Sequence, residues 1–329
     1  DHFLFYFPVI LAMTAFSATA PGKLILFGEH AVVYGQPAIA VPINIVSARA
    51  VVSAAPHAPN GQVRIIAPGI SLDAYIADLP AEHPLKLAIT LTAGRIGAAR
   101  LPALEVRLTS SIPLAAGFGS SAATSIAVIR AVASFIGHSL PDDDVSDLAY
   151  QIEKHHHGNP SGIDNTVIAF NRPVYFVRGQ PFEILPAKKP FTLVIADTGI
   201  PSSTAAVVSD VSRLYQAQSQ STGRIFAAIG DISRQARQFL EEGKVEELGG
   251  LMNQNQRLLQ ELTISSLELD HLIEAARMGG AAGAKLSGGG RGGNIIALVS
   301  QETAASVESA LISAGALQTW TTTIPGEKS

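Results

Sequence analysis

The chain has 329 residues, of which 47% are hydrophobic and 15% charged, with a formal net charge of -4 and no cysteine. This composition excludes a disordered chain, and the length favours two domains that share one cleft. The lack of any basic run argues against a nucleic-acid partner, and the lack of cysteine excludes disulfides and thiolate chemistry. Because a reducing compartment is permitted, we expect a cytoplasmic protein.

The N-terminal segment contains an apolar run, Phe3–Leu11, that resembles the hydrophobic part of a signal peptide. The segment has no positively charged start, and it is far shorter than the roughly 20 apolar residues that span a bilayer. We therefore interpret residues 1–12 as a non-native or leader extension, with Met13 as the start of the protein. We expect no association with a membrane.

The first half of the chain alternates predicted strands and helices. Lys23 lies at the edge of the first strand, and residues 84–94 have the pattern of a helix. The segments with strand patterns, either short apolar runs or stretches rich in β-branched or alternating residues, are 24–27, 38–41, 46–52, 63–67 and 104–108.

Two predicted helices follow a glycine-rich stretch. Residues 120–135 are mostly Ala, Ile and Val, which predicts a buried helix that Ser121 can cap. The next helix opens at Asp142 and is expected to stop at Gly158. Glu153 follows the buried stripe of that helix by one position, so it is rotated about 100° away and can face a cleft.

The second half of the chain is predicted to form a separate domain. Four helical segments, 204–218, 224–242, 245–262 and 267–278, follow a strand at 191–196. Strands at 282–286, 294–299 and 319–324, with a helix at 302–314, complete the order of a ferredoxin-like unit. We therefore expect an α+β fold with domains at 13–186 and 187–329.

The glycine-rich stretch Pro113–Ala123 places two glycines and two serines at the start of the helix at 120–135. Free backbone N–H groups and the helix dipole favour a phosphate there, and the glycines allow close approach. The same stretch also fits a dinucleotide fingerprint, with Asp142 to Asp144 at the expected distance for a ribose ligand. Because those aspartates begin a helix instead of ending a strand, a dehydrogenase is disfavoured.

A P-loop is also disfavoured, since the chain lacks the Gly-x-x-x-x-Gly-Lys-Ser/Thr string. Any triphosphate site must therefore take its lysine from elsewhere, and Lys23 is the candidate. His155, His156 and His157 are consecutive on a helix and point in different directions, which argues against a zinc site.

One long block closely resembles the opening signature of the mevalonate kinases: Ala20-Pro-Gly-Lys-Leu-Ile-Leu-Phe-Gly-Glu-His-Ala-Val-Val-Tyr-Gly35. These kinases belong to the superfamily of galactokinases, homoserine kinases, mevalonate kinases and phosphomevalonate kinases. Two more blocks resemble the family in the expected order, namely Pro113–Ala123 and Glu153-x-x-x-His157-Gly-Asn-Pro-Ser-Gly-Ile-Asp-Asn165.

The resemblance implies a two-domain small-molecule kinase fold. Its N-terminal domain would be like the second domain of ribosomal protein S5, its C-terminal domain would be ferredoxin-like, and ATP would lie in the cleft between them. The implied reaction is the phosphorylation of the 5-hydroxyl of mevalonate, on the route to isoprenoids. A homodimer is compatible with this reading.

The resemblance also implies residue roles. Asp164 would be the catalytic acidic group beside the substrate hydroxyl, with Lys23 next to it, and Ser121 and Glu153 would hold Mg2+. Hard oxygen ligands suit Mg2+, and phosphoryl transfer needs mainly alignment, charge neutralisation and a carboxylate that accepts the hydroxyl proton. Residues implied to bind ATP are Pro113, Ala116, Gly117, Gly119, Ser120, Ser121 and Ala122. Those implied near the mevalonate pocket are Glu29, His30 and Thr204.

The third family signature, which is a second glycine-rich stretch, departs from the family pattern in this chain. Gly288-Gly-Gly-Arg-Gly-Gly293 stands where Gly-Ala-Gly-Gly-Gly-Gly is expected, and we expect Arg291 to point outward and to be peripheral to catalysis. Phosphomevalonate kinase, homoserine kinase and a catalytically silent nucleotide-binding regulator remain as alternatives. The Gly28–Gly35 string argues against the first two, and retention of Lys23, Glu153 and Asp164 against the third.

Overall fold

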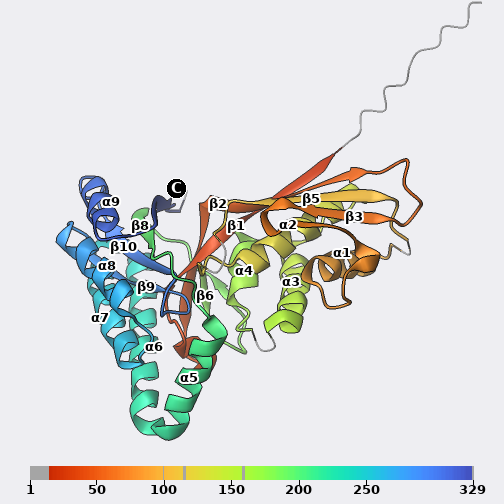
Figure 1. The fold of residues 1–329 in the computed structure, drawn as a ribbon. Helices are drawn as coiled ribbons and strands as arrows, with labels where there is room; N and C mark the ends of the chain where they lie inside the picture. Colours follow the sequence, from red (N-terminus) through yellow and green to blue (C-terminus); the bar gives the residue numbers. More distant parts are fainter. Residues whose placement is uncertain (1–14, 99, 114–115, 158–159, 328–329) are drawn as a thin grey trace, which may run out of the picture.

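The computed structural model describes residues 15–98, 100–113, 116–157 and 160–327. These residues form two domains, with the N-terminal domain on the right of Figure 1 and the C-terminal domain on the left. The last strand of the first sheet ends at Ile184 and the first strand of the second sheet begins at Phe191, and the proposed boundary at 186/187 falls between them. The proposed extension at residues 1–12 and Met13 lie outside the described residues.

The N-terminal domain is built on a seven-stranded sheet of order β4-β3-β5-β2-β6-β7, with β1 paired to β2. The strands are β1 (Phe16–Phe27), β2 (Ala38–Ala54), β3 (Val63–Ala67), β4 (Leu72–Tyr75), β5 (Leu104–Ser110), β6 (Val174–Phe176) and β7 (Glu183–Ile184). All neighbours are antiparallel except β3 and β5. The helices of this domain are α1 (Pro84–Arg95), α2 (Ser120–Phe135), α3 (Asp142–His157) and α4 (Ile163–Phe170).

The strand predictions for 24–27, 38–41 and 46–52 were too short. The second and third belong to one strand, β2, and the first is only the end of β1, so Lys23 lies within a strand and not at its edge. Pro21 and Gly22 interrupt the apolar pattern of β1, and the pairing register shifts between them. The register skips residues 44–46 of β2 at this point, and such an interruption of the pairing accommodates proline and glycine inside a long strand, which explains the underestimate.

The predicted helices of the N-terminal domain are confirmed at 84–94, 120–135 and 142 onward. Helix α3 ends at His157, and Gly158 lies outside the described residues. Helix α4 was not predicted. It has only eight residues, and its N-cap Gly162 has a positive φ of 90°, so its sequence looked like a turn.

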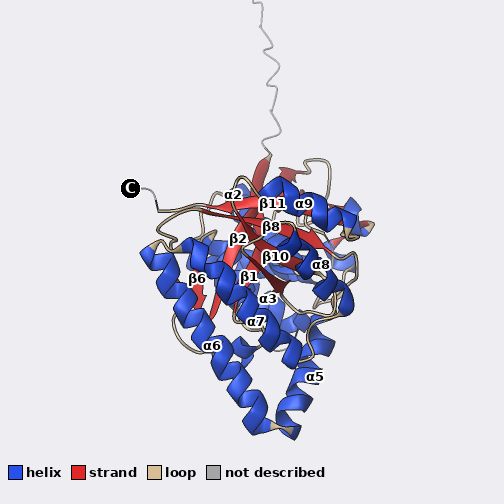
Figure 2. Ribbon diagram, turned by 90° about the vertical axis from the view of Figure 1, so that its left-hand side faces the viewer, coloured by secondary structure: helices blue, strands red, loops and turns tan. Residues whose placement is uncertain are grey.

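The C-terminal domain has a four-stranded antiparallel sheet of order β11-β8-β10-β9, as a ferredoxin-like unit requires. Its strands are β8 (Phe191–Asp197), β9 (Gly283–Ser287), β10 (Asn294–Val299) and β11 (Gln318–Ile324). Its helices are α5 (Thr204–Ala217), α6 (Ser219–Glu242), α7 (Leu248–Glu261), α8 (Leu267–Met278) and α9 (Ala304–Ser313). Figure 2 shows α5 and α6 as a helical hairpin that projects away from this sheet.

Three strands of the second sheet, β8, β9 and β10, are buried on both faces. Val194 and Ile295 belong to a core cluster formed with the helices of the C-terminal domain. Leu193 and Ile296, which point to the opposite face, belong to the core of the N-terminal domain. The two domains therefore share one continuous apolar interface, and this interface positions the glycine-rich segments of both.

Candidate active site

The first glycine-rich loop ends directly at helix α2. Gly117 and Gly119 have φ values of 85° and 75°, and Gly119 is the N-cap of the helix. A Cβ on Gly119 would lie 2.9 Å from Ile168 Cδ1 and 3.0 Å from Lys23 Cγ, so no side chain fits there. The N–H groups of the first turn of α2 are consequently available for an anion, as expected for a phosphate loop.

The predicted capping role of Ser121 is wrong. The N-cap is Gly119, and the Ser121 hydroxyl donates to Glu153 Oε1 on α3 at 2.6 Å. Glu153 is only 7% exposed, which agrees with its placement one position beyond the buried stripe of α3. This hydrogen bond brings together the two residues expected to hold a metal.

Lys23 and Asp164 form an ion pair, with Lys23 Nζ 3.1 Å from Asp164 Oδ1. Lys23 lies in β1, where its backbone N–H donates to Phe118 O of the first glycine loop at 2.9 Å. Asp164 is the second residue of α4 and its side chain is 36% exposed, whereas that of Lys23 is 7% exposed. The ammonium is thus buried beside a carboxylate that a substrate can reach.

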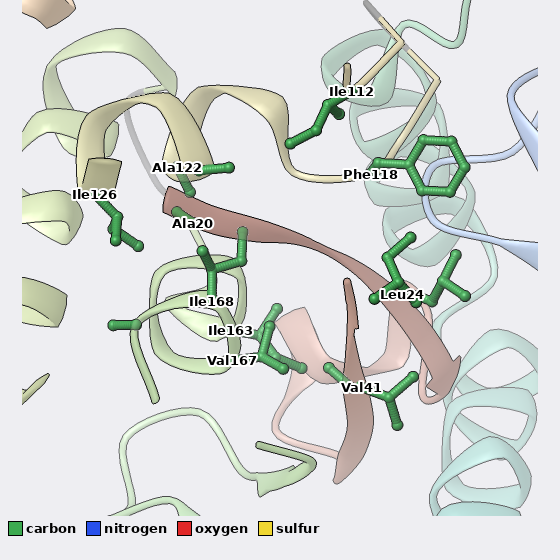
Figure 3. Packing of buried hydrophobic residues seen from close by; sticks show 14 of the residues in the cluster. Ala20, Leu24, Val41, Ile112, Phe118, Ala122, Ile126, Ile163, Val167 and Ile168 are labelled. Atoms are coloured by element: carbon green, nitrogen blue, oxygen red, sulfur yellow. The ribbon is translucent and has the colours of Figure 1, made fainter. Parts of the chain in front are cut away.

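The core beneath this pair brings β1, α2 and α4 into contact. Figure 3 shows Ala20 of β1 beside Ala122 of α2 and Ile168 of α4, with Val167 of α4 and Leu24 of β1 further along the same cluster. All five are fully buried members of one apolar cluster. Close packing of this kind holds side chains in defined positions, which fixes the geometry of Lys23 against Asp164.

Glu29 lies just after β1 and is almost completely buried, with an exposed fraction of 3%. Its Oε1 forms an ion pair with Lys285 of β9, and its Oε2 accepts a hydrogen bond from Asn255 of α7 at 3.3 Å. Burial lowers the pKa of the Lys285 ammonium, while the carboxylate of Glu29 opposes that effect. Both oxygens of Glu29 are therefore engaged by the C-terminal domain.

His30 has an unusual backbone conformation, with φ 58° and ψ -44°. Its Nε2 lies 2.9 Å from Gly289 O, and because a carbonyl only accepts, Nε2 carries the proton. Burial lowers the pKa of His30 to about 4, and the positive charge of Arg291 acts in the same direction. The imidazole is therefore neutral near pH 7, with Nδ1 as an acceptor.

The second glycine-rich loop, residues 288–293, faces both the first loop and the start of α5. Asn294 Nδ2 donates to Ala116 O, and Ser202 Oγ donates to Gly290 O at 2.7 Å. A Cβ on Gly289 would lie 2.6 Å from Thr204 Oγ1, which places Thr204 against the loop. The structure thus brings His30 and Thr204 together at Gly289 of this loop, while Glu29, next to His30 in sequence, contacts Lys285 and Asn255.

Comparisons with known proteins identify relatives of this chain. Two family descriptions match, the GHMP kinases N terminal domain at residues 83–172 and the GHMP kinases C terminal domain at residues 236–317. A protein named mevalonate kinase from Pyrococcus horikoshii is 35% identical, and the match covers 85% of this chain and 88% of that protein. A protein named mevalonate kinase from Thermococcus sibiricus is 36% identical, and the match covers 87% of this chain and 89% of that protein. The crystal structure of L. major mevalonate kinase in complex with R-mevalonate superposes with a TM-score of 0.81 at 30% identity, and the match covers 95% of this chain and 97% of that one.

The chain belongs to the mevalonate kinase family of GHMP kinases. The α+β fold with two domains and the assignment as an ATP-dependent kinase are confirmed by this membership. The individual site residues stay predictions, since their roles rest on matched motifs and on the geometry described above.

Arg291 is the residue at which this member of the family departs from the expected glycine run. Its backbone has φ 52°, its Nε donates to Thr263 O at 3.0 Å, and its Nη1 pairs with Asp210 of α5. The guanidinium is therefore occupied by partners within the C-terminal domain. This geometry favours the peripheral role expected for it.

Sequence reasoning missed Lys285 and Asn255, which engage Glu29, and Ser287, whose hydroxyl bonds both the N–H and the carbonyl of Ile25. A usable signal was present for the first of these, because Lys285 interrupts a strand in which every residue is buried. Lysine is almost never fully buried without a partner, so its position demanded an acid nearby. The His155–His157 run is not informative, since the side chains of His156 and His157 lie outside the described residues.

Proposed function

We propose that this chain transfers the γ-phosphoryl group of ATP to the 5-hydroxyl of mevalonate, giving 5-phosphomevalonate and ADP. The observation that supports the chemistry best is the pair formed by Lys23 and Asp164, with a contact of 3.1 Å beside the start of α2. The choice of mevalonate is supported by the family and by the relative that binds R-mevalonate.

In this proposal Asp164 accepts the proton of the attacking hydroxyl. Its side chain is partly exposed, so a substrate oxygen can come within hydrogen-bond distance. The Lys23 ammonium lies beside this carboxylate and offsets negative charge around the transferred group. Since phosphoryl transfer depends mainly on position and charge, these two side chains supply most of what the acceptor needs.

The ATP phosphates are proposed to lie against the first glycine loop. Gly117 has no Cβ that would hinder close approach, Ala116 and Gly119 belong to the same loop, and Ser120, Ser121 and Ala122 present the first N–H groups of α2. Pro113 lies just ahead of the loop. Hydrogen bonding of Ala116 O to Asn294 fixes the loop against the second domain, so the site is organised before nucleotide binds.

Ser121 and Glu153 are proposed to hold Mg2+. Their oxygens lie 2.6 Å apart and are of the hard type that this ion prefers. Among the described residues no group of three or more His, Cys, Asp and Glu side chains could hold a metal, which fits an ion that takes its other ligands from water and phosphate. When bound, Mg2+ would neutralise phosphate charge.

The mevalonate pocket is proposed to involve His30 and Thr204, with Glu29 behind them. Neutral His30 can accept a hydrogen bond through Nδ1, and Thr204 is an exposed hydroxyl at the first residue of α5. A cytoplasmic location and a homodimer belong to the same proposal. Within the described part of the chain, no helix combines the length and the apolar character needed to cross a bilayer.

The proposed function is tested by coupled ADP release with mevalonate, homoserine, galactose and phosphomevalonate as competing acceptors. We expect kcat/KM for mevalonate to exceed that for each of the others by at least about a hundredfold, since a wrong polar group leaves buried partners unpaired. Preference for another acceptor would overturn the substrate assignment. ADP release with none of them, despite intact nucleotide binding, would favour a silent regulator.

A further inference from the structure

The Glu29–Lys285–Asn255 cluster joins the two domains through buried charge. The side chains of Lys285 and Glu29 are 0% and 1% exposed, and Lys285 Nζ also donates to Leu286 O at 2.6 Å. Asn255 is fully buried, and its Oδ1 has no hydrogen-bond partner among the described residues. Among the residues that the structure describes, Glu29 is therefore the one that orients the Asn255 side-chain amide.

A buried ion pair of this kind is weak support for stability. Removing two charges from water is unfavourable, and apolar residues of similar volume often stabilise a core as well or better. What the pair does provide is a defined geometry, since a buried charge tolerates only an arrangement that keeps its partner in place. The cluster therefore acts by holding a neighbouring segment in place.

The segment held is the one that carries His30. Gly28, just before Glu29, has φ 98°, and a Cβ there would lie 2.5 Å from Ala38 Cα, so the turn out of β1 is tight. His30, just after Glu29, reaches Gly289 of the second loop. Ser287, which shares a face of β9 with Lys285, bonds both backbone groups of Ile25, two residues from Lys23. One strand of the C-terminal domain thus fixes β1 and the turn that follows it.

We propose that Glu29 is a positioning residue, which Lys285 and Asn255 hold so that His30 and the end of β1 keep their register with the second glycine loop. In this role Glu29 does not contact the substrate, because both of its oxygens are engaged within the protein. The inference deepens the proposed function, on which it rests for the identity of the substrate. It changes the expected role of Glu29 from a residue that contacts mevalonate to one that holds the His30 turn in place.

A double-mutant cycle with Glu29→Gln and Lys285→Met tests the inference. Each single variant leaves one buried partner unmatched, so we expect KM for mevalonate to rise about tenfold while kcat changes less than about threefold. In the double variant, which buries no unmatched charge, KM should be no worse than in Lys285→Met alone. If Glu29 bound the substrate directly, the two effects would multiply, and that result would overturn the proposal.

Amide hydrogen exchange gives a readout independent of turnover. We expect faster exchange in residues 28–34 of Lys285→Met and recovery in the double variant, because the cluster holds this turn. Unchanged exchange in Lys285→Met would contradict the inference. Asn255→Ser, which removes only the bond to Oε2, should act in the same direction and remains usable if Lys285→Met does not fold.

The control is Lys244→Met, which breaks an exposed ion pair with Glu242. Exposed pairs contribute little, so this variant should match the unmodified protein in KM and in exchange. If the unmodified protein does not phosphorylate mevalonate, the proposed function fails. In that case, hydrogen exchange and thermal unfolding of the two single variants and the double variant still show whether the effects of Lys285 and Glu29 depend on each other.

Discussion

At the scale of single residues, the account depends on a lysine and an aspartate that come from different elements. Lys23 belongs to β1 and Asp164 to α4, and they meet because both elements pack on the same core. Neither side chain would identify an active site on its own. Their pairing at the start of α2 is what gives the arrangement a chemical use.

We predict that Asp164→Asn and Lys23→Met each lower kcat about a hundredfold or more, since each removes positioned charge from the transfer step. The variants should keep the circular dichroism spectrum of the unmodified protein. Steady-state kinetics at saturating ATP measures the effect. A near-normal kcat in either variant would show that the residue has no part in the reaction.

For Ser121→Ala and Glu153→Gln we predict a higher Mg2+ requirement, because each change removes or weakens an oxygen ligand. Titration of Mg2+ at a fixed ATP concentration gives the half-saturating value. Ser134→Ala, in the last turn of the same helix, serves as the control and should titrate normally. Normal titrations for Ser121→Ala and Glu153→Gln alike would exclude these residues as ligands.

His30 should make stability depend on pH. Its pKa is lowered to about 4 in the folded protein from 6.5, so the unfolded chain binds a proton first as pH falls. The contribution of His30 to the free energy of unfolding is fully present above pH 6.5 and is lost as the pH falls towards 4. We expect the free energy of unfolding to fall by about 2 kcal/mol between about pH 7.5 and about pH 5.

Urea unfolding at these two pH values tests the prediction for His30. His30→Gln should lose less stability on acidification, because its amide can still donate to Gly289 O but does not titrate. His138→Gln, at an exposed position, is the control and should behave as the unmodified protein does. Equal losses in the His30 variant and the unmodified protein would show that His30 titrates normally.

At the scale of elements, the second glycine-rich loop is held by contacts that could not be predicted from its sequence. Arg291 has a positive φ, and its side chain links α5 through Asp210 to the turn at Thr263, which also has a positive φ of 58°. The ion pair is partly exposed and so adds little stability. Its main effect is to hold the guanidinium against α5 and the turn at Thr263.

We predict that Arg291→Gly changes kcat and the KM for ATP by less than about threefold, an energy under about 1 kcal/mol. Glycine adopts this backbone conformation without strain, which offsets the lost contacts. Kinetics with varied ATP measures both constants. A KM for ATP raised about tenfold or more would mean that Arg291 binds phosphate directly.

Helices and strands in which apolar residues recur regularly could be predicted from the sequence, and those in which this pattern is interrupted could not. Helix α2 was predicted at its observed bounds because apolar residues fill it from the glycine loop onward. The continuity of β2 was missed because Pro42 and Asn44 divide its apolar runs. The site followed from motifs, but Lys285 was missed because its partner lies 256 positions away in sequence.

At the scale of the whole molecule, the two domains act as one body around the site. The second sheet contributes apolar residues to both cores, and polar bonds from Lys285, Ser287 and Asn294 fasten the two glycine-rich loops to each other and to β1. Such a junction fixes the first glycine-rich loop, the Lys23–Asp164 pair and the His30 turn relative to one another. Positioning of this kind is the main requirement of phosphoryl transfer.

We propose that this site phosphorylates the primary hydroxyl of mevalonate. The 31P NMR spectrum of the product formed from ATP and mevalonate tests this directly. The account predicts a monophosphate whose phosphorus couples to the two protons of the adjacent methylene group, and no such product with Asp164→Asn over the same time. A phosphorus signal without that coupling would place the phosphate on the tertiary hydroxyl and contradict the account.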